Sequence, residues 1–181
     1  SVHAQPAGDP DEWSGLDIID GYLWAQEVLS EMAYMKMAII DAEGKIDDEK
    51  RLLAAFRFNE DGSTNYLVRL LSPEDVKGVT VLTNQPLNST VANQYLYLPS
   101  VGETRRLTPT TKSRPFLNSD YSLEDLQREL PSAHTYKRLD DGFVHGAPVF
   151  VVRAVERDED GGSAYHFRDL YIDKDSFDLL K

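Results

Sequence analysis

Apolar and polar residues alternate along much of the chain, and this alternation predicts most of its secondary structure. A period of two residues is typical of β-strands that bury one side. Two such strands are expected at 51–58 and 65–70, following an earlier strand at 32–40, with glycine-containing turns at 42–45 and 59–62 between them. We therefore expect three antiparallel strands joined by short hairpins. Their apolar positions in the second and third strands are Leu52, Ala54, Phe56, Phe58, Tyr66, Val68 and Leu70.

Residues 13–32 have the helical period instead and predict one long helix. One broad face of this helix is apolar, whereas Trp24 and Val28 fall on the opposite side with Asp17. Two interpretations remain open for Trp24: it packs on a neighbouring loop, or the helix is apolar on two sides because it covers something. The residues of the broad face are Leu16, Ile18, Ile19, Tyr22, Leu23 and Leu29.

The strand at 32–40 is apolar on both sides and contains all three methionines of the chain, Met32, Met35 and Met37. This pattern predicts a central strand that is buried on both faces. The alternative is functional: flexible, polarisable methionine side chains line a surface that fits varied apolar shapes.

Shorter strands are expected in the second half of the chain. The segment 103–107 is the expected partner of 94–98, and a hairpin is expected around the acidic turn at 158–162, whose carboxylates we interpret as solvated. A glycosylation sequon at 88–90 matters only in a glycosylating secretory pathway.

The segment RPFLNSDYSLEDL, residues 114–126, combines a turn with a helix start. Pro115 interrupts sheet pairing, and Ser122 and Asp125 have the spacing of a capping box, in which Asp125 reaches back to the start of the helix. Phe116 and Leu117 are apolar residues in a linker. They either fold over the mouth of a groove as part of a lid or plug the end of the core.

Length and charge narrow the classes of function. With 181 residues, the simplest organisation is a flexible tail over 1–12 and a single domain over 13–181. The formal net charge of −12 disfavours nucleic-acid binding and tight adhesion to anionic lipid surfaces. The polar N-terminus is expected to be either a mature start, from which a targeting signal has been removed, or a trimmed one.

The sequence contains no pattern that predicts catalysis, a cofactor or a metal site. Cysteine is absent, and the four histidines are scattered without ligand spacing. The carboxylates cluster in turns that we expect to be exposed to solvent, whereas catalytic pairs need a desolvated setting. No apolar run is long enough to span a bilayer. We therefore expect no enzyme, no cofactor, no metal and no membrane span.

Three segments resemble a known family. LVRLLSPEDVKGVTVL, QYLYLPSVGETRRL and RPFLNSDYSLEDL follow one another in the order seen in the bacterial outer-membrane lipoprotein-sorting family, the LolA/LolB-like superfamily. The resemblance covers roughly 14–175, and SDYSLEDL is its most specific part. It implies an α+β, mostly antiparallel fold: a strongly curved, unclosed half-barrel sheet with helices lidding the concave face. Further strands usually follow YIDKDSF in the family, so the domain is expected to be short or truncated at its C-terminus, with an open sheet edge.

The resemblance also implies a function. It predicts a periplasmic carrier for a lipid or for the acyl chains of a lipoprotein, with a membrane exporter as a further partner. The alternative is a non-carrying envelope regulator or accessory module that docks an exporter or a signalling protein. The expected cavity residues are Met35, Met37, Phe56, Phe58, Tyr66, Val68, Phe150 and Val152, and the expected lid residues are Leu23, Trp24, Phe116, Leu117 and Tyr121.

Overall fold

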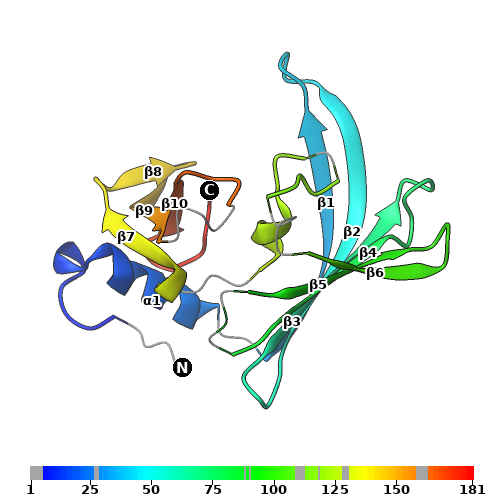
Figure 1. Ribbon diagram of the computed structural model, residues 1–181. Coiled ribbons are helices and arrows are strands. Elements are labelled where there is room, and N and C mark those ends of the chain that lie inside the picture. The colour runs from blue at the N-terminus through cyan, green and yellow to red at the C-terminus, as the bar shows by residue number, and fades with distance from the viewer. Residues whose placement is uncertain are drawn as a thin grey trace. The chain divides into compact units, whose positions relative to one another are not determined.

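The computed structural model describes residues 6–26, 29–87, 89, 91–108, 113–117, 119–127, 131–157 and 163–181. The chain divides into two compact units, whose helix and strands are labelled in Figure 1. Unit 1 comprises Ser1–Glu27 and Glu129–Lys181, and unit 2 comprises Val28–Arg128. Each unit has its own hydrophobic core and is described by itself. The single domain expected over 13–181 stays a prediction.

Unit 2 is a six-stranded antiparallel meander in which each strand pairs with the next one along the chain (Figure 1). The expected hairpins are confirmed, as is the pairing of residues 94–98 with 103–107. The sheet is open, with β1 at one edge and β6 at the other. Its strands are β1 (Ser30–Ile40), β2 (Ile46–Phe58), β3 (Thr64–Ser72), β4 (Thr80–Gln85), β5 (Asn93–Leu98) and β6 (Glu103–Leu107).

The prediction that the methionine-containing strand is central and buried on both faces is wrong. β1 is an edge strand, and Met32 and Tyr34 are 68% and 80% exposed. A strand with apolar residues on both sides is buried on both faces only when other layers cover both faces of its sheet. The second interpretation, a methionine-lined surface, therefore stays open.

Unit 1 packs one α-helix on a small antiparallel sheet. α1 (Gly15–Ala25) lies against β7 (His134–Arg138) and β9 (Ala147–Glu156). The sheet has the order β10-β9-β7, with β8 (Gly142–Val144) also paired to β9 and β10 (Arg168–Asp173) at the edge. Three 3₁₀ turns complete the described elements: η1 (Pro10–Glu12) and η4 (Pro131–Ala133) in unit 1, and η3 (Leu123–Leu126) in unit 2.

The helix is shorter than the pattern predicts. Ser14 caps its N-terminus: the backbone N–H and the hydroxyl of Ser14 both donate to the Asp17 carboxylate, at 2.8 and 2.6 Å. These hydrogen bonds lower the pKa of Asp17, the side-chain bond contributing most. At the other end the helix stops at Ala25, because the chain from Ser30 onward pairs with β2 as a strand. Residues 27 and 28, expected within the helix, lie outside the described residues.

The apolar face of α1 is buried in the core of unit 1. Ile18, Ile19 and Leu23 pack with Phe150, Val152, Ile172 and Phe177. The approach is close at two glycines: a methyl group on Gly15 would lie 2.9 Å from the backbone nitrogen of Arg138, and one on Gly21 would lie 2.5 Å from the Phe177 ring. Glycine therefore lets the helix lie directly on β7 and on the C-terminal segment.

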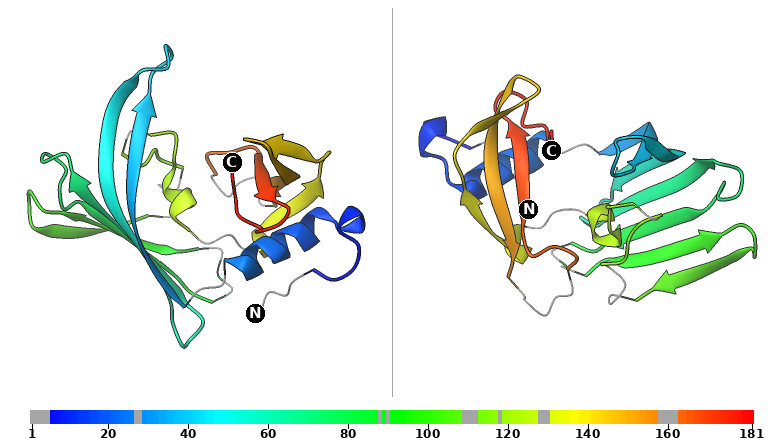
Figure 2. Two further views of the ribbon diagram at one scale, coloured as in Figure 1. Left: turned by 180° about the vertical axis from the view of Figure 1, so that it is seen from behind. Right: turned by 90° about the horizontal axis from the view of Figure 1, so that it is seen from above.

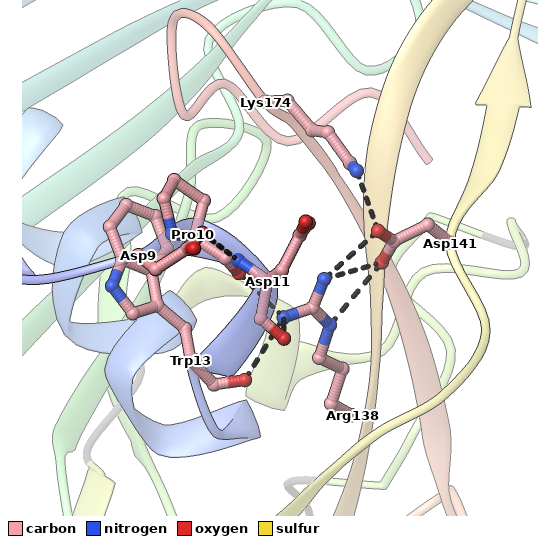
Figure 3. A network of polar contacts seen from close by, with 7 residues as sticks. All are labelled: Asp9, Pro10, Asp11, Trp13, Arg138, Asp141 and Lys174. Atoms are coloured by element: carbon pink, nitrogen blue, oxygen red, sulfur yellow. Dashed lines mark hydrogen bonds and ion pairs between the residues drawn. The ribbon is translucent and has the colours of Figure 1, made fainter.

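Arg138 ties the residues before α1 to the sheet of unit 1 (Figure 3). Its Nη1 donates to the carbonyl oxygens of Pro10 and Trp13, at 2.7 and 3.1 Å. Its Nη2 is 2.9 Å from the Asp141 carboxylate, which also accepts from Lys174 at 2.5 Å. Residues 10–12, which were expected in a flexible tail, form η1, and Arg138 binds their backbone. Residues 1–5 lie outside the described residues.

The fold class is confirmed in its coarser form: a mostly antiparallel β protein with one α-helix among the described residues and two unclosed sheets. Strong curvature and helices that lid a concave face stay predictions. Asn88 and Thr90 of the sequon and the acidic turn at 158–162 lie outside the described residues.

Candidate functional site

One face of the six-stranded sheet gathers most of the side chains expected to line a cavity. Directly paired residues in antiparallel strands point to the same side of the sheet. The register joins Met35 to Leu52, Phe56 to Tyr66, and Ala54 to Val68, and alternation adds Met37 and Phe58 to that side. We call this side the apolar face. Its apolar side chains include Met35, Met37, Leu52, Ala54, Phe56, Phe58, Tyr66, Val68, Leu70, Val81, Leu96 and Leu107.

Residues 113–117 and 119–127 pack on the middle of the apolar face, and we call them the covering segment (Figure 2). Phe116, Leu123 and Leu126 are buried and form one hydrophobic cluster with sheet residues Leu52, Val68 and Val81. Leu117 is partly buried against the same cluster and has a φ of 55°, a left-handed backbone conformation that is strained for a leucine. Tyr121, in contrast, is exposed.

A buried glutamine binds the covering segment to the sheet. Gln94 of β5 is 5% exposed, and its side-chain nitrogen donates to the Leu123 carbonyl oxygen at 2.8 Å and to the Thr83 hydroxyl at 3.1 Å. The segment also closes on itself, since the Phe116 N–H donates to the Tyr121 carbonyl oxygen at 2.6 Å. Thr83 and Gln94, two buried polar side chains of the apolar face, thus have defined hydrogen-bond partners.

The expected capping interaction is present at η3. The Asp125 carboxylate accepts hydrogen bonds from the Ser122 backbone N–H at 2.7 Å and from the Ser122 hydroxyl at 2.9 Å. The prediction that Asp125 reaches back to the start of this turn is therefore confirmed. The cap fixes the short turn that presents Leu123 and Leu126 to the sheet.

Toward β1 the apolar face is less covered. Met35 is 49% exposed, and Met37, Phe56, Phe58 and Tyr66 are half-buried. Burial raises the pKa of the Tyr66 hydroxyl, and the nearby charges of Glu31 and Tyr121 raise it further. The β1 side of the face is therefore an apolar surface on which part of each side chain remains accessible to solvent.

A cation lies at one end of this surface. Lys50 is directly paired with Met37 and is buried, and its ammonium group binds the Asp48 carboxylate. The hydrogen bond from Lys50 lowers the pKa of Asp48.

The other expected site residues lie in unit 1. Phe150 and Val152 are 1% and 0% exposed and belong to the core beneath α1, together with Leu23. Trp24 is on the helix surface and is 42% exposed. The structure therefore places six of the expected cavity residues on one side of the unit 2 sheet: Met35, Met37, Phe56, Phe58, Tyr66 and Val68. Of these, Met37, Tyr66 and Val68 share a hydrophobic cluster with Phe116 and Leu117 of the covering segment. Leu23, Phe150 and Val152 belong instead to the core of unit 1.

Unit 1 contains a different depression. An open cleft of about 800 Å³ lies on the side of its sheet away from α1, and Val151, Asp169 and Tyr171 contribute to its lining. Asp169 is bound to Arg153 by two hydrogen bonds of 2.7 Å, which lower its pKa. Among the described residues no group of three or more His, Asp or Glu side chains has the arrangement of a metal site.

Three comparisons relate these features to known proteins. A family model with the description "Uncharacterized protein" matches residues 62–181, well over half of the chain. The chain belongs to this family. The matched range begins in the β2–β3 turn and includes the covering segment and all strands of the unit 1 sheet. A search of curated proteins finds no match to the chain.

Solved structures establish the fold. An outer membrane lipoprotein-sorting protein domain from Vibrio parahaemolyticus aligns with a TM-score of 0.78 at 24% identity, over 92% of this chain and 69% of that one. A DUF1329 family protein from Desulfovibrio piger aligns with a TM-score of 0.77 at 21% identity, over 92% and 70%. A LolA superfamily protein from Nitrosomonas europaea reaches only 0.48 at 17% identity, over 82% and 59%. The resemblance to lipoprotein-sorting proteins is thus confirmed, and at these identities it establishes the fold.

Sequence reasoning missed the polar anchor of the covering segment. Thr83 and Gln94 occur in short strands and show nothing locally that distinguishes them from surface residues. The one signal was their alternation with Leu82 and Tyr95, which places both polar side chains on the side opposite to those residues.

Among the described residues no helix is long and apolar enough to cross a membrane.

Proposed function

We propose that this protein is a periplasmic carrier or binding protein for a lipid, or for the acyl chains of a lipoprotein, and that the hydrocarbon chain lies on the apolar face. The proposal includes no catalytic step, no cofactor and no metal. It takes a lipid or lipoprotein as the ligand and an exporter in the inner membrane as a further partner.

The observation that carries the proposal is the shared side of the sheet. Six residues expected to bind lipid, from three adjacent strands, point to one surface that is apolar, partly accessible and bordered by the covering segment. Their exposure is graded: Val68, beneath the covering segment, is buried, and Met35, toward the sheet edge, is half exposed. A hydrocarbon chain that lies from β3 to β1 would remove these half-exposed side chains from water.

The physical chemistry of this surface suits a reversible carrier. Burial of an alkyl chain contributes about 0.8 kcal/mol for each methylene removed from water, without directional contacts. Methionine side chains adapt to chains of different shape, and two of the three methionines lie on this face.

Uptake of a fluorescent fatty acid by the purified protein tests the proposal. Phe56→Asp places a charge on the apolar face and is expected to reduce probe affinity at least tenfold. Leu67→Asp is the matched control, because Leu67 is also half-buried in the same sheet but points to the opposite side. Both variants should retain the far-UV circular dichroism of the wild type. Equal uptake by both variants would contradict the proposal.

A second function is favoured by one observation: the covering segment occupies the centre of the apolar face with its own side chains. A face filled in this way suits a non-carrying envelope module that docks an exporter or a signalling protein. Native mass spectrometry after gentle purification separates the two functions. Co-purified fatty acid or phospholipid supports the carrier, whereas a clean mass and no probe uptake support the docking module.

A further inference from the structure

The side of the six-stranded sheet opposite to the apolar face has an unusual distribution of charge for this chain. The full sequence contains 31 acidic and 19 basic residues. On this side, however, Lys36, Arg51, Arg57, Arg69 and Arg106 project from four strands. The strand residues of this side in β3 to β6, and in β2 from Arg51 onward, include no Asp or Glu. We call this side the arginine face.

Three of these arginines are available for an external partner. Arg51, Arg57 and Arg69 are exposed, and none of them forms an ion pair or a side-chain hydrogen bond with another described residue. Lys36 is paired with Glu49, and Arg106 donates to the side-chain oxygen of Asn93 at 2.6 Å. The cations of the arginine face are therefore incompletely neutralised within the part of unit 2 that the structure describes.

Between the arginines lies a row of apolar side chains. Met32, Ala55, Leu67, Leu82 and Tyr95 are successive cross-strand neighbours from β1 to β5. Arg57 belongs to the next row on one side and Arg69 to the next row on the other. Apolar and aromatic residues flanked by cations are the composition of surfaces that lie at a membrane interface.

We propose that the arginine face docks on the surface of a membrane that contains anionic phospholipids. Guanidinium groups form bidentate hydrogen bonds with phosphates, and the apolar row would contact the boundary between head groups and acyl chains. The most exposed apolar side chains of the arginine face, Tyr34 and Met32, lie on the edge strand β1. Protruding side chains of this kind suit insertion into a lipid interface, whereas a partner helix would need a groove. This docking does not require that the apolar face holds a ligand.

The net charge of −12 does not prevent this docking. At physiological ionic strength, charges farther apart than about 8 Å are largely screened from each other in water. The local sign of the arginine face therefore decides the interaction, whereas the acidic residues elsewhere limit its strength. The expected binding is consequently weak, reversible and dependent on salt.

Co-sedimentation of the full chain with vesicles tests the proposal. We expect binding to phosphatidylethanolamine–phosphatidylglycerol vesicles at low salt, loss of that binding at high salt, and little binding to pure phosphatidylcholine. The double variant Arg57→Gln/Arg69→Gln should weaken partitioning about 25-fold, because each basic residue near an anionic surface contributes about fivefold.

A matched control removes the same charge elsewhere. Arg105→Gln/Lys77→Gln takes away two exposed cations that are paired with Glu103 and Glu74, and Arg105 points to the other side of the sheet. This control should bind the anionic vesicles as the wild type does. Two results would overturn the proposal. One is that the wild type does not bind these vesicles, which is expected if the face docks an acidic protein. The other is that both double variants weaken binding equally. Fatty-acid uptake by Arg57→Gln/Arg69→Gln should remain at the wild-type level, so the docking and the carrier function are tested separately.

Discussion

Single polar residues hold together parts of each unit that the hydrophobic pattern leaves independent. Gln94 joins β5 to the covering segment, and Arg138 joins β7 to the backbone before α1. Both act on carbonyl oxygens of segments that lack strand partners of their own. The Leu123 carbonyl oxygen is buried, and a buried carbonyl oxygen that loses its donor costs free energy, so the role of Gln94 is measurable.

Gln94→Leu is expected to lower the free energy of unfolding of unit 2 by about 1–3 kcal/mol, because the Leu123 carbonyl loses its donor while the side-chain volume stays similar. Thr83→Val is the graded control: it removes the Thr83 hydroxyl but leaves the bond between Gln94 and Leu123 intact, so it should cost less. Urea denaturation followed by far-UV circular dichroism measures both. A larger cost for Thr83→Val would contradict the assigned role of Gln94.

Asp141 makes the stability of unit 1 depend on pH. Burial alone would raise the pKa of Asp141, but hydrogen bonds and charges from Lys174 and Arg138 outweigh it and hold the pKa below its usual value. A lowered pKa in the folded state means that this stabilisation is complete above the unfolded-state pKa of about 4 and is lost as pH falls through the folded-state pKa.

Asp141→Asn is therefore expected to destabilise unit 1 at neutral pH, by about 1–2 kcal/mol, and to have a smaller effect in acid. Both tryptophans of the chain, Trp13 and Trp24, are in unit 1, so tryptophan fluorescence reports its unfolding selectively. The stabilities of wild type and variant should converge between neutral pH and about pH 3. A difference that stays constant over this range would show that the carboxylate charge is not responsible.

At the scale of elements, the sequence predicts local structure better than the assignment of strands to sheets. Alternation correctly places Phe56 and Tyr66 on one side of their strands because it is a property of the extended backbone. From the same alternation in β9 we predicted Phe150 and Val152 as cavity residues. They belong to a second sheet, which packs against α1. The pattern within a strand does not encode which other strand it pairs with.

The capping interaction of Asp125 was predictable because its partner, Ser122, is three residues away. The edge position of β1 was not predictable, because methionines on both sides of a strand look the same whether a neighbouring layer covers them or water does. The side of the sheet to which residues of β1 to β3 point was thus predictable from alternation, whereas the polar anchor of the covering segment was not.

The contact of α1 with β7 depends on the absence of a side chain at Gly15. In an exposed helix, Gly→Ala usually stabilises by about 1 kcal/mol. At Gly15 a methyl group would lie 2.9–3.0 Å from the backbone of residues 136–138, so Gly15→Ala should lower the melting temperature reported by tryptophan fluorescence. Gly142→Ala is the matched control, because its methyl would meet neighbours at an ordinary 3.7 Å. An unchanged or raised melting temperature for Gly15→Ala would contradict this close packing.

The covering segment occupies the centre of the apolar face with its own side chains. Phe116→Ala removes a buried ring from its centre, so unit 2 should lose about 3–5 kcal/mol while space opens beside Leu52 and Val68. Uptake of the fluorescent fatty acid by the folded variant should therefore become faster. Phe143→Ala, in which a 77% exposed ring of unit 1 is removed, should change neither property. Slower or abolished uptake in a folded Phe116→Ala would mean that the ring contacts the ligand and does not exclude it.

At the scale of the whole molecule, unit 2 presents two sheet faces of different chemistry. The apolar face is proposed to hold hydrocarbon, and the arginine face is proposed to contact an anionic membrane. A net charge calculated over the chain averages these surfaces with the acidic turns and therefore conceals the arginine face. Register, which assigns each residue to a face, is the property that makes the difference visible.

Photo-crosslinking with a diazirine fatty acid, followed by mapping of the adducts with mass spectrometry, tests the central claim most directly. The carrier account predicts that adducts concentrate on residues of the apolar face such as Met35, Phe56 and Tyr66, and that excess unlabelled fatty acid removes them. Adducts that concentrate in unit 1, or on arginine-face residues such as Leu67 and Leu82, would contradict it.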